Sequence, residues 1–430
     1  MDLGCIFQNI DQDLSQRWFL PQLLAYHWKH LVRMYTLWIS KSLAYSSITI
    51  ELYLQMCHSL ERQSMTNAAN TERESLMSTI HDYLKEYYGK TISGKNDLKT
   101  KACMCAPNAH SKEVRTVMPL IANEIVSKFY GCGSPIPPLL EGKTILDLGC
   151  GTGRDVYIAA KLAGESGFAI GVDMTEEQLA VARTHEDEQR IRFGFEKSNV
   201  VFHRGFIEDL AAIGIGDETI DVVISNCVIN LSPSKEAVFR EIYRVLKPGG
   251  ELFFSDVFAD RRIPENISSD LVILGECLGG ATYVEDFRRI MQKTGWADFR
   301  NMSVRSIAMD NEDIEKKAGF IQFSECTIRA FKLDSLEDIC EDYGQVAYYD
   351  GSIAGYPHFF DLDDHHRFYT GKPMLVCGNT AAMLEQTRFA KAFRVVGDRS
   401  VHYGAFDCSG ESRSESRCSE CASPTSGSCC

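Results

Sequence analysis

A short glycine-rich segment, residues 147–153, constrains the fold of this chain more than any other feature. Its sequence, DLGCGTG, follows an apolar run at residues 143–146 and leads into a helix-like stretch at residues 154–162. Glycines at alternate positions let the backbone turn tightly and come close to a ligand, and the following helix presents unpaired N–H groups to a polar or anionic group. The order of strand, glycine turn and helix therefore predicts a ligand-binding βα unit.

The kind of ligand is indicated by an acid at the end of the next apolar run. This run covers residues 168–172, and Asp173 follows it about 20 residues after the last glycine, a distance at which an acid can bind two ribose hydroxyls. The spacing G-x-G-x-G differs from the G-x-G-x-x-G of dinucleotide sites, so a pyrophosphate is not required. The two motifs predict a nucleoside cofactor, and they resemble the first two motifs of S-adenosylmethionine-dependent methyltransferases, which have a Rossmann-like sheet.

Strands and helices are expected to alternate after the glycine turn. Strands are predicted at residues 144–148, 168–172, 200–203, 220–225 and 251–256. Helix starts are indicated by capping boxes beginning at Thr175 and Thr282 and by the dipeptide Ser232-Pro233. This order predicts an α/β fold with a doubly wound, mainly parallel sheet. Ligands of such sheets bind outside the carboxyl ends of the strands, so Asp173, residues 207–208 and residues 226–227 should meet in one crevice.

The sequence predicts five segments. They are an unassigned extension or leader at 1–74, a helical region at 75–142 with helices near 75–88 and 112–130, a cofactor-binding catalytic domain at 143–308, a smaller C-terminal α+β domain at 309–403, and a disordered Ser/Cys-rich tail at 404–430. The C-terminal domain should contain strands at 320–333 and 345–349 and a helix at 380–387. No motif with recognisable chemistry lies in that domain.

Composition excludes several classes of protein. The formal net charge of −14 argues against a nucleic-acid binder, for which a basic stripe is expected. Charged residues interrupt the aromatic N-terminal segment before it reaches the roughly 20 apolar residues of a membrane span. The chain has 16 cysteines but neither a clear secretory signal nor the repeated spacing of a disulfide scaffold. We therefore expect a cytoplasmic protein with reduced thiols and no membrane or nucleic-acid partner.

Several cysteines are placed where a reaction on the cofactor would occur. Cys227 directly follows the fourth predicted strand, Cys277 lies after the fifth, and Cys132 stands between two glycines before the first. A single free cysteine is more often a small buried residue, and Cys150 in the glycine turn is interpreted in that way. Several thiols around one crevice instead indicate a soft, thiophilic acceptor.

The cysteine-bearing segments 97–103, 130–133, 225–231 and 275–280 resemble, in the same order, those of the arsenite methyltransferases. The resemblance extends over about residues 75–393, and the terminal Cys429-Cys430 is similar to thiol-rich tails of that family. It implies that Cys132, Cys227 and Cys277 bind arsenic(III). It also implies that Cys103, or its neighbour Cys105, takes part in a thiol–disulfide step.

The same resemblance implies S-adenosylmethionine as cofactor, arsenite and methylated arsenic(III) as substrates, and a thiol reductant of the glutathione or thioredoxin type. The residues expected to bind the cofactor are Tyr130, Asp147, Gly149, Gly151, Gly153, Asp173, Met174, Gln178, Ile207, Glu208 and Asn226. Two other interpretations are open at this point. One is a methyltransferase for a quinone, sterol or other organic acceptor, and the other is a thiol-rich arsenic-binding protein without turnover.

Overall fold

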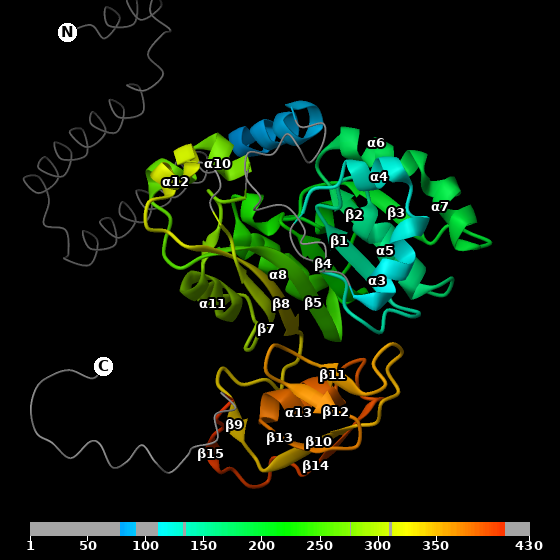
Figure 1. The fold of residues 1–430 in the computed structure, drawn as a ribbon, viewed down its shortest axis with the longest axis vertical. Coiled ribbons are helices and arrows are strands. Elements are labelled where there is room, and N and C mark those ends of the chain that lie inside the picture. Colours follow the sequence, from blue (N-terminus) through cyan, green and yellow to red (C-terminus); the bar gives the residue numbers. More distant parts are fainter. Residues whose placement is uncertain (1–77, 92–110, 132–134, 276, 309–311, 409–430) are drawn as a thin grey trace, which may run out of the picture. The chain divides into compact units, whose positions relative to one another are not determined.

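The largest element of the protein is an eight-stranded sheet. The structure is a computed structural model, and it describes residues 78–91, 111–131, 135–275, 277–308 and 312–408. The main path of the sheet has the order β3-β2-β1-β4-β5-β8-β7, and β6 pairs with β5 (Figure 1). The strands are β1 Thr144–Leu148, β2 Phe168–Asp173, β3 Val200–Arg204, β4 Ile220–Asn226, β5 Leu246–Ala259, β6 Thr282–Tyr283, β7 Arg300–Ser306 and β8 Phe323–Phe331. All five strands predicted between residues 144 and 256 are confirmed.

Strands β1 to β5 run parallel to one another, and helices cover both faces of their sheet. Alternate residues of β1 enter two different cores: Ile145 packs in the core beneath α5, and Leu146 packs in the core beneath α8. A parallel sheet buried on both faces has continuous apolar strands, which is why the sequence pattern located them well. The helices around the sheet are α3 Lys112–Val117, α4 Asn123–Ser127, α5 Arg154–Ala163, α6 Glu176–Thr184, α7 Glu186–Phe193, α8 Lys235–Val245, α9 Glu265–Ser268, α10 Leu271–Gly275, α11 Val284–Lys293 and α12 Glu312–Ala318.

Strand β8 lies in the main sheet and not in the smaller C-terminal region where the sequence interpretation placed it. It pairs antiparallel with β5 from Glu251↔Phe331 to Ala259↔Phe323, and antiparallel with β7 on its other edge. The strand–helix alternation expected to stop near residue 309 continues through α12 to β8, but β8 is antiparallel to its neighbours and so does not belong to a βαβ unit. We therefore propose that the C-terminal region begins after β8.

The helical predictions needed three corrections. The helix expected at residues 112–130 is divided into α3, a 3-10 turn at Met118–Leu120 and α4, because Pro119 cannot continue an α-helix. Neither predicted capping box forms, since neither N-cap residue makes a side-chain cap bond and the N-cap of α11 is Tyr283. Helix α8 begins at Lys235, after Ser234, and not at Pro233. The helix expected near 75–88 is present at residues 78–86 and continues as a π-helical turn, η2 Tyr87–Thr91.

A smaller strand-rich region follows β8. It contains β9 Glu341–Asp342, β10 Gln345–Tyr349, β11 Phe359–Asp361, β12 Arg367–Tyr369, β13 Pro373–Val376, α13 Gly378–Glu385, β14 Phe393–Val396 and β15 Gly404–Ala405. Strand β10 stands between β13 and β14 in an antiparallel sheet, and the helix predicted at 380–387 is α13. This region has its own core of buried aromatic and aliphatic side chains.

Buried charges connect this region to the main sheet. Arg329 of β8 donates to Glu251 of β5 over 2.5 Å and also to the backbone carbonyl of Leu362. The second carboxylate oxygen of Glu251 forms an ion pair with Arg388, whose Nε donates to the carbonyl of Pro138 over 3.0 Å. Glu251 is fully buried, so one carboxylate neutralises two buried guanidinium groups.

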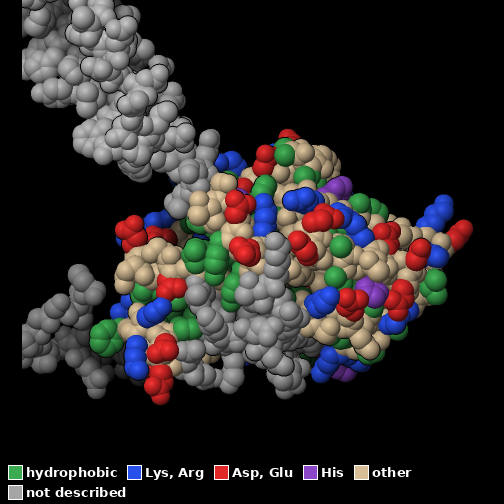
Figure 2. Space-filling model, turned by 90° about the horizontal axis from the view of Figure 1, so that it is seen from above, with side chains coloured by type: hydrophobic (Ala, Val, Ile, Leu, Met, Phe, Trp, Pro, Cys, Tyr) green, Lys and Arg blue, Asp and Glu red, His purple; other side chains and the backbone are tan. Residues whose placement is uncertain are grey.

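On the face shown in Figure 2, Lys and Arg side chains of the described residues alternate with Asp and Glu side chains. Among the described helices, none is both long and apolar enough to cross a membrane.

Candidate active site

The three glycines after β1 all adopt the left-handed conformation, with φ of +69° at Gly149, +52° at Gly151 and +85° at Gly153. They differ in what surrounds them. A Cβ on Gly149 would lie 2.4 Å from Val228 Cγ1, and one on Gly153 would lie 2.9 Å from Phe202 Cε1. A Cβ on Gly151 would meet no atom closer than 3.9 Å. Gly149 and Gly153 are therefore required by packing, whereas Gly151 lines an open pocket.

Asp173, at the carboxyl end of β2, lies beside this turn. Its Oδ2 accepts a hydrogen bond from the Gly151 N–H over 2.9 Å, and its Oδ1 accepts one from the Thr175 N–H over 2.8 Å. Burial raises the pKa of this carboxyl, and these backbone donors oppose the increase. Asp147 is also buried, and burial together with the nearby Asp155 raises its pKa well above the ordinary value.

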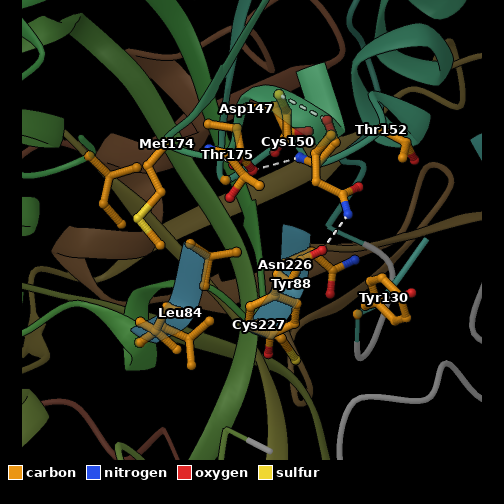
Figure 3. Close-up of a pocket in the computed structure, with 18 of the residues that line it drawn as sticks. Leu84, Tyr88, Tyr130, Asp147, Cys150, Thr152, Met174, Thr175, Asn226 and Cys227 are labelled. Atoms are coloured by element: carbon orange, nitrogen blue, oxygen red, sulfur yellow. Dashed lines mark hydrogen bonds between the residues drawn. The ribbon is translucent and has the colours of Figure 1, made fainter. Parts of the chain in front are cut away.

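Asn226, the last residue of β4, presents an acceptor to the same pocket. Its Nδ2 donates to Asp155 Oδ2 over 3.1 Å, while no described group donates to its buried Oδ1. Figure 3 shows Asn226 between Cys150 of the glycine turn and Cys227 in that view. A buried carbonyl oxygen without a donor costs free energy, so this position favours a ligand that carries an N–H or O–H group.

Glu208 and the aromatic residues around it form another part of the pocket lining. Glu208 accepts hydrogen bonds from Ser232 Oγ over 2.6 Å and from His81 Nε2 over 3.4 Å. Burial raises the pKa of this carboxyl, but those two hydrogen bonds outweigh it and the pKa is lowered. The His81 ring stacks on Phe206 with 4.4 Å between centroids. Ile207, Met174 and Gln178 line the same pocket, and Gln178 Nε2 donates to the Tyr88 carbonyl over 2.8 Å.

Cys227 and Cys277 both line this pocket, and both have an unusual backbone. Cys227 has φ of +56° and Cys277 has φ of +63°, which residues other than glycine seldom adopt. Both side chains are buried, and Cys277 Sγ lies 3.3 Å from the Cys227 carbonyl oxygen. Cys227 is disulfide-bonded in the structure, whereas Cys277 is not.

A buried polar network contacts the turn that follows Cys227. The Asn230 N–H donates to Asp256 Oδ2 over 3.0 Å, and Asn230 Nδ2 donates to Asp256 Oδ1 over 2.7 Å. Lys235 Nζ donates to the Asn230 carbonyl over 3.3 Å. Burial raises the pKa of Asp256 to about 7 and lowers the pKa of Lys235 to about 8. These bonds hold the turn that follows Cys227 against β5.

The structure brings together the expected cofactor residues that lie in the described part of the chain. Tyr130, Asp147, Gly149, Gly151, Asp173, Met174, Gln178, Ile207, Glu208 and Asn226 line one pocket with Cys227 and Cys277. Gly153 does not line it and shapes the turn instead. Cys103 and Cys132 lie outside the described residues. Cys150 is a free, buried thiol in the turn, as interpreted from the sequence.

Sequence reasoning missed the contribution of residues 78–91 to this pocket. Leu84 and Tyr88 line it, and the Tyr88 hydroxyl donates to the Gly275 carbonyl over 2.6 Å, two residues before Cys277. A Cβ on Gly275 would lie 2.8 Å from Tyr87 Cε1, so the two segments are in close contact. The helical spacing of the aromatic residues was visible in the sequence, but it indicated only an amphipathic helix.

Comparison with known proteins assigns the chain to a family. A methyltransferase domain model matches residues 139–295, and a model of the arsenite methyltransferase C-terminal domain matches residues 342–430. An arsenite methyltransferase of Aquipseudomonas alcaligenes is 48% identical over 77% of this chain and 95% of its own length. The chain belongs to the arsenite methyltransferase family.

Two further relatives agree with this assignment. The arsenite methyltransferase of Mus musculus is 42% identical over 73% of this chain and 83% of its own length. The crystal structure of an arsenic(III) S-adenosylmethionine methyltransferase from Chlamydomonas reinhardtii is 50% identical, with a TM-score of 0.68, and covers 69% of this chain and 100% of the solved one. A ubiquinone biosynthesis O-methyltransferase of Vibrio parahaemolyticus matches only 34% of this chain, at 34% identity.

Proposed function

We propose that this chain is an S-adenosylmethionine-dependent arsenite methyltransferase whose Cys227 and Cys277 hold arsenic(III) beside the cofactor. The observation that carries the proposal is that both cysteines line the same pocket as the glycine turn and Asp173. The family assignment supports the reaction and the substrate. Because the relatives named for ubiquinone biosynthesis match only a minor part of the chain, an organic acceptor is not favoured.

The pocket residues fit the parts of the cofactor. Asp173 has two carboxylate oxygens for ribose hydroxyls, and the open side of Gly151 leaves room for a ligand to approach the backbone. Asn226 Oδ1 is a buried acceptor suited to the amino group of the methionine part. When bound, S-adenosylmethionine supplies an electrophilic methyl group on a positively charged sulfur.

The cysteines determine which nucleophile reacts. Thiolates bind arsenic(III) and leave its lone pair exposed, so no proton has to be removed from the nucleophile and no general base is needed. This differs from O- and N-methyltransferases, which use a positioned base. The protein contributes alignment of the reacting atoms and exclusion of water. The burial of Cys227 and Cys277 agrees with both tasks.

A reductant is required after each transfer. When the lone pair forms the new bond to carbon, arsenic is oxidised from the trivalent to the pentavalent state. Two thiols return the two electrons and release two protons as they form a disulfide, and we propose Cys103 and Cys132 for this pair. Cys227 is itself disulfide-bonded in the structure, and a sulfur in a disulfide cannot bind arsenic. We propose that an external thiol of the glutathione or thioredoxin type resets the site, and such thiols are maintained in a reducing compartment such as the cytoplasm.

Product analysis of the purified full-length protein tests this function. The protein is incubated with arsenite, S-adenosylmethionine and a thiol, and arsenic species are separated by chromatography and quantified by mass spectrometry. We expect methylated arsenicals from the wild type and none from Cys227→Ser. The matched control is Cys326→Ser, another buried cysteine, which lies in β8 and does not line the pocket. Methylated arsenic formed by Cys227→Ser at the wild-type rate would refute the role of this thiol.

A further inference from the structure

Three cysteines that play no part in the active site lie together in the C-terminal region. Cys340 directly precedes β9, Cys377 directly precedes α13, and Cys408 follows β15. Their sulfur atoms all lie within 4.8 Å of one another, and all three are free thiols. None of them lines the pocket that contains Cys227 and Cys277. The fold thus gathers three sulfur ligands from three separate segments.

Hydrogen-bond donors surround these sulfurs. Arg300 Nη2 donates to Cys340 Sγ and to Cys377 Sγ, each over 3.8 Å. The Thr380 N–H, at the start of α13, donates to Cys377 Sγ over 3.4 Å. Arg300 is buried and is held in place by Asp298 at 2.7 Å and Asp363 at 3.6 Å. A guanidinium group and a helix N-terminus stabilise thiolates, which are the form of cysteine that binds soft ions.

We infer that Cys340, Cys377 and Cys408 form a second arsenic(III)-binding site, separate from the site of methyl transfer. Arsenous acid exchanges its three hydroxyl groups for the three sulfurs. Each thiol supplies one proton to a departing hydroxide, so three water molecules leave and no electrons are transferred. The choice of arsenic as ligand rests on the proposed function, but binding at this site needs neither the cofactor nor turnover.

The ligand geometry favours arsenic(III) over zinc. A structural zinc site takes four ligands in a tetrahedron, whereas arsenic(III) is satisfied by three sulfurs. Two histidine nitrogens, of His365 and His366, lie within 4.8 Å of Cys408, but they form a group with this cysteine and not with the full triad. Among the described residues, three sulfurs are thus the ligand set that converges.

Arsenic stoichiometry on the full-length protein tests this inference. The reduced wild type and single variants are saturated with arsenite without S-adenosylmethionine, desalted, and analysed for arsenic per chain. Cys340→Ser and Cys408→Ser are the informative variants, because both residues are partly exposed and their substitution should not unfold the protein. We expect each single variant to bind one equivalent of arsenic fewer than the wild type. The double variant, with both Cys340→Ser and Cys408→Ser, should also bind only one equivalent fewer, because both residues belong to the same site. Cys326→Ser is the matched control and should bind as the wild type does.

Two further measurements identify the bound species and keep folding effects apart. X-ray absorption spectra of the arsenite-loaded proteins report the sulfur neighbours of the bound arsenic. The wild type should hold one more arsenic atom with three sulfur neighbours than Cys408→Ser does. Arsenite should raise the melting temperature of Cys227→Ser, because a ligand that binds the folded state stabilises it and this ligand joins three segments. The increase should be smaller in the double variant that also carries Cys408→Ser. Melting without arsenite verifies that each variant is folded.

Three results would overturn the inference. One is an equal arsenic content in Cys408→Ser and Cys326→Ser. Another is a full equivalent of zinc in the purified protein that is lost in Cys408→Ser, which would make this a zinc site. The third is a disulfide within the triad that persists under the reducing assay conditions, together with unchanged arsenic content. A methylation assay of Cys408→Ser separates the two proposals, since methyl transfer should continue when this second site is lost.

Discussion

Gly149 and Gly151 provide a sharp test of how the cofactor is bound, because their backbones are similar and their surroundings are not. Both have positive φ, so alanine at either position costs about 1–2 kcal/mol of backbone strain. At Gly149 the added methyl would also lie 2.4 Å from Val228 Cγ1, and overpacking of this kind costs a further 1–3 kcal/mol or so. At Gly151 the methyl meets no protein atom within 3.8 Å, since the nearest is Gln178 Oε1 at 3.9 Å.

The two variants should therefore fail in different ways. Urea unfolding should show a loss of about 2–5 kcal/mol for Gly149→Ala, the sum of strain and overpacking, and about 1–2 kcal/mol for Gly151→Ala. Calorimetric titration with S-adenosylmethionine should show weakened binding for Gly151→Ala although the protein remains folded, because its methyl occupies the space that the ligand needs. Wild-type affinity in Gly151→Ala would refute the close approach of the cofactor to this turn.

Three further predictions concern other residues. Asp173→Ala should weaken cofactor binding about 12- to 140-fold in calorimetry, since hydrogen bonds to a charged group contribute about 1.5–3 kcal/mol; unchanged affinity would remove Asp173 from the site. In single-turnover assays, Cys132→Ser should abolish methyl transfer to arsenite but retain transfer to monomethylarsenic(III), which has two exchangeable positions, whereas Cys227→Ser and Cys277→Ser should abolish both; equal losses in all three variants would contradict these roles. Glu251→Ala should lower the free energy of unfolding by about 3–5 kcal/mol in urea, because two buried arginines lose their counter-ion; a loss below about 1 kcal/mol, as for an exposed pair, would contradict this.

Much of the sheet could be predicted because its strands are buried on both faces. Residues 144–148 of this sheet were predicted with the bounds that the structure gives them. The apolar runs are continuous and end at glycine or polar residues, which marks their limits. The site could also be located in part, since the carboxyl ends of β1, β2 and β4 follow from the strand limits alone.

Features that depend on tertiary contacts could not be predicted. Gln178 belongs to one predicted capping box and Thr282 to the other. In the structure, Gln178 instead donates to the Tyr88 carbonyl, and Thr282 Oγ1 donates to Asn230 Oδ1 over 3.2 Å. Both partners are more than 50 residues away in sequence, and no local pattern records them. The C-terminal cysteine triad escaped for the same reason, because its members lie on three separate segments without metal-site spacing.

The backbone at Cys227 and Cys277 is the strongest structural indication that these residues were placed for chemistry. A residue with a Cβ in the left-handed region costs about 1–2 kcal/mol, and such strain persists only where the surroundings enforce it. Here the Cys227 N–H donates to the Ser255 carbonyl over 2.8 Å, the Cys277 N–H donates to the Leu274 carbonyl over 2.9 Å, and Asp256 holds the turn after Cys227. Glycine would relieve the strain at either position but would remove a sulfur. Two strained cysteines at one pocket are thus better explained by a ligand that requires both thiols than by packing, for which an unstrained backbone would serve.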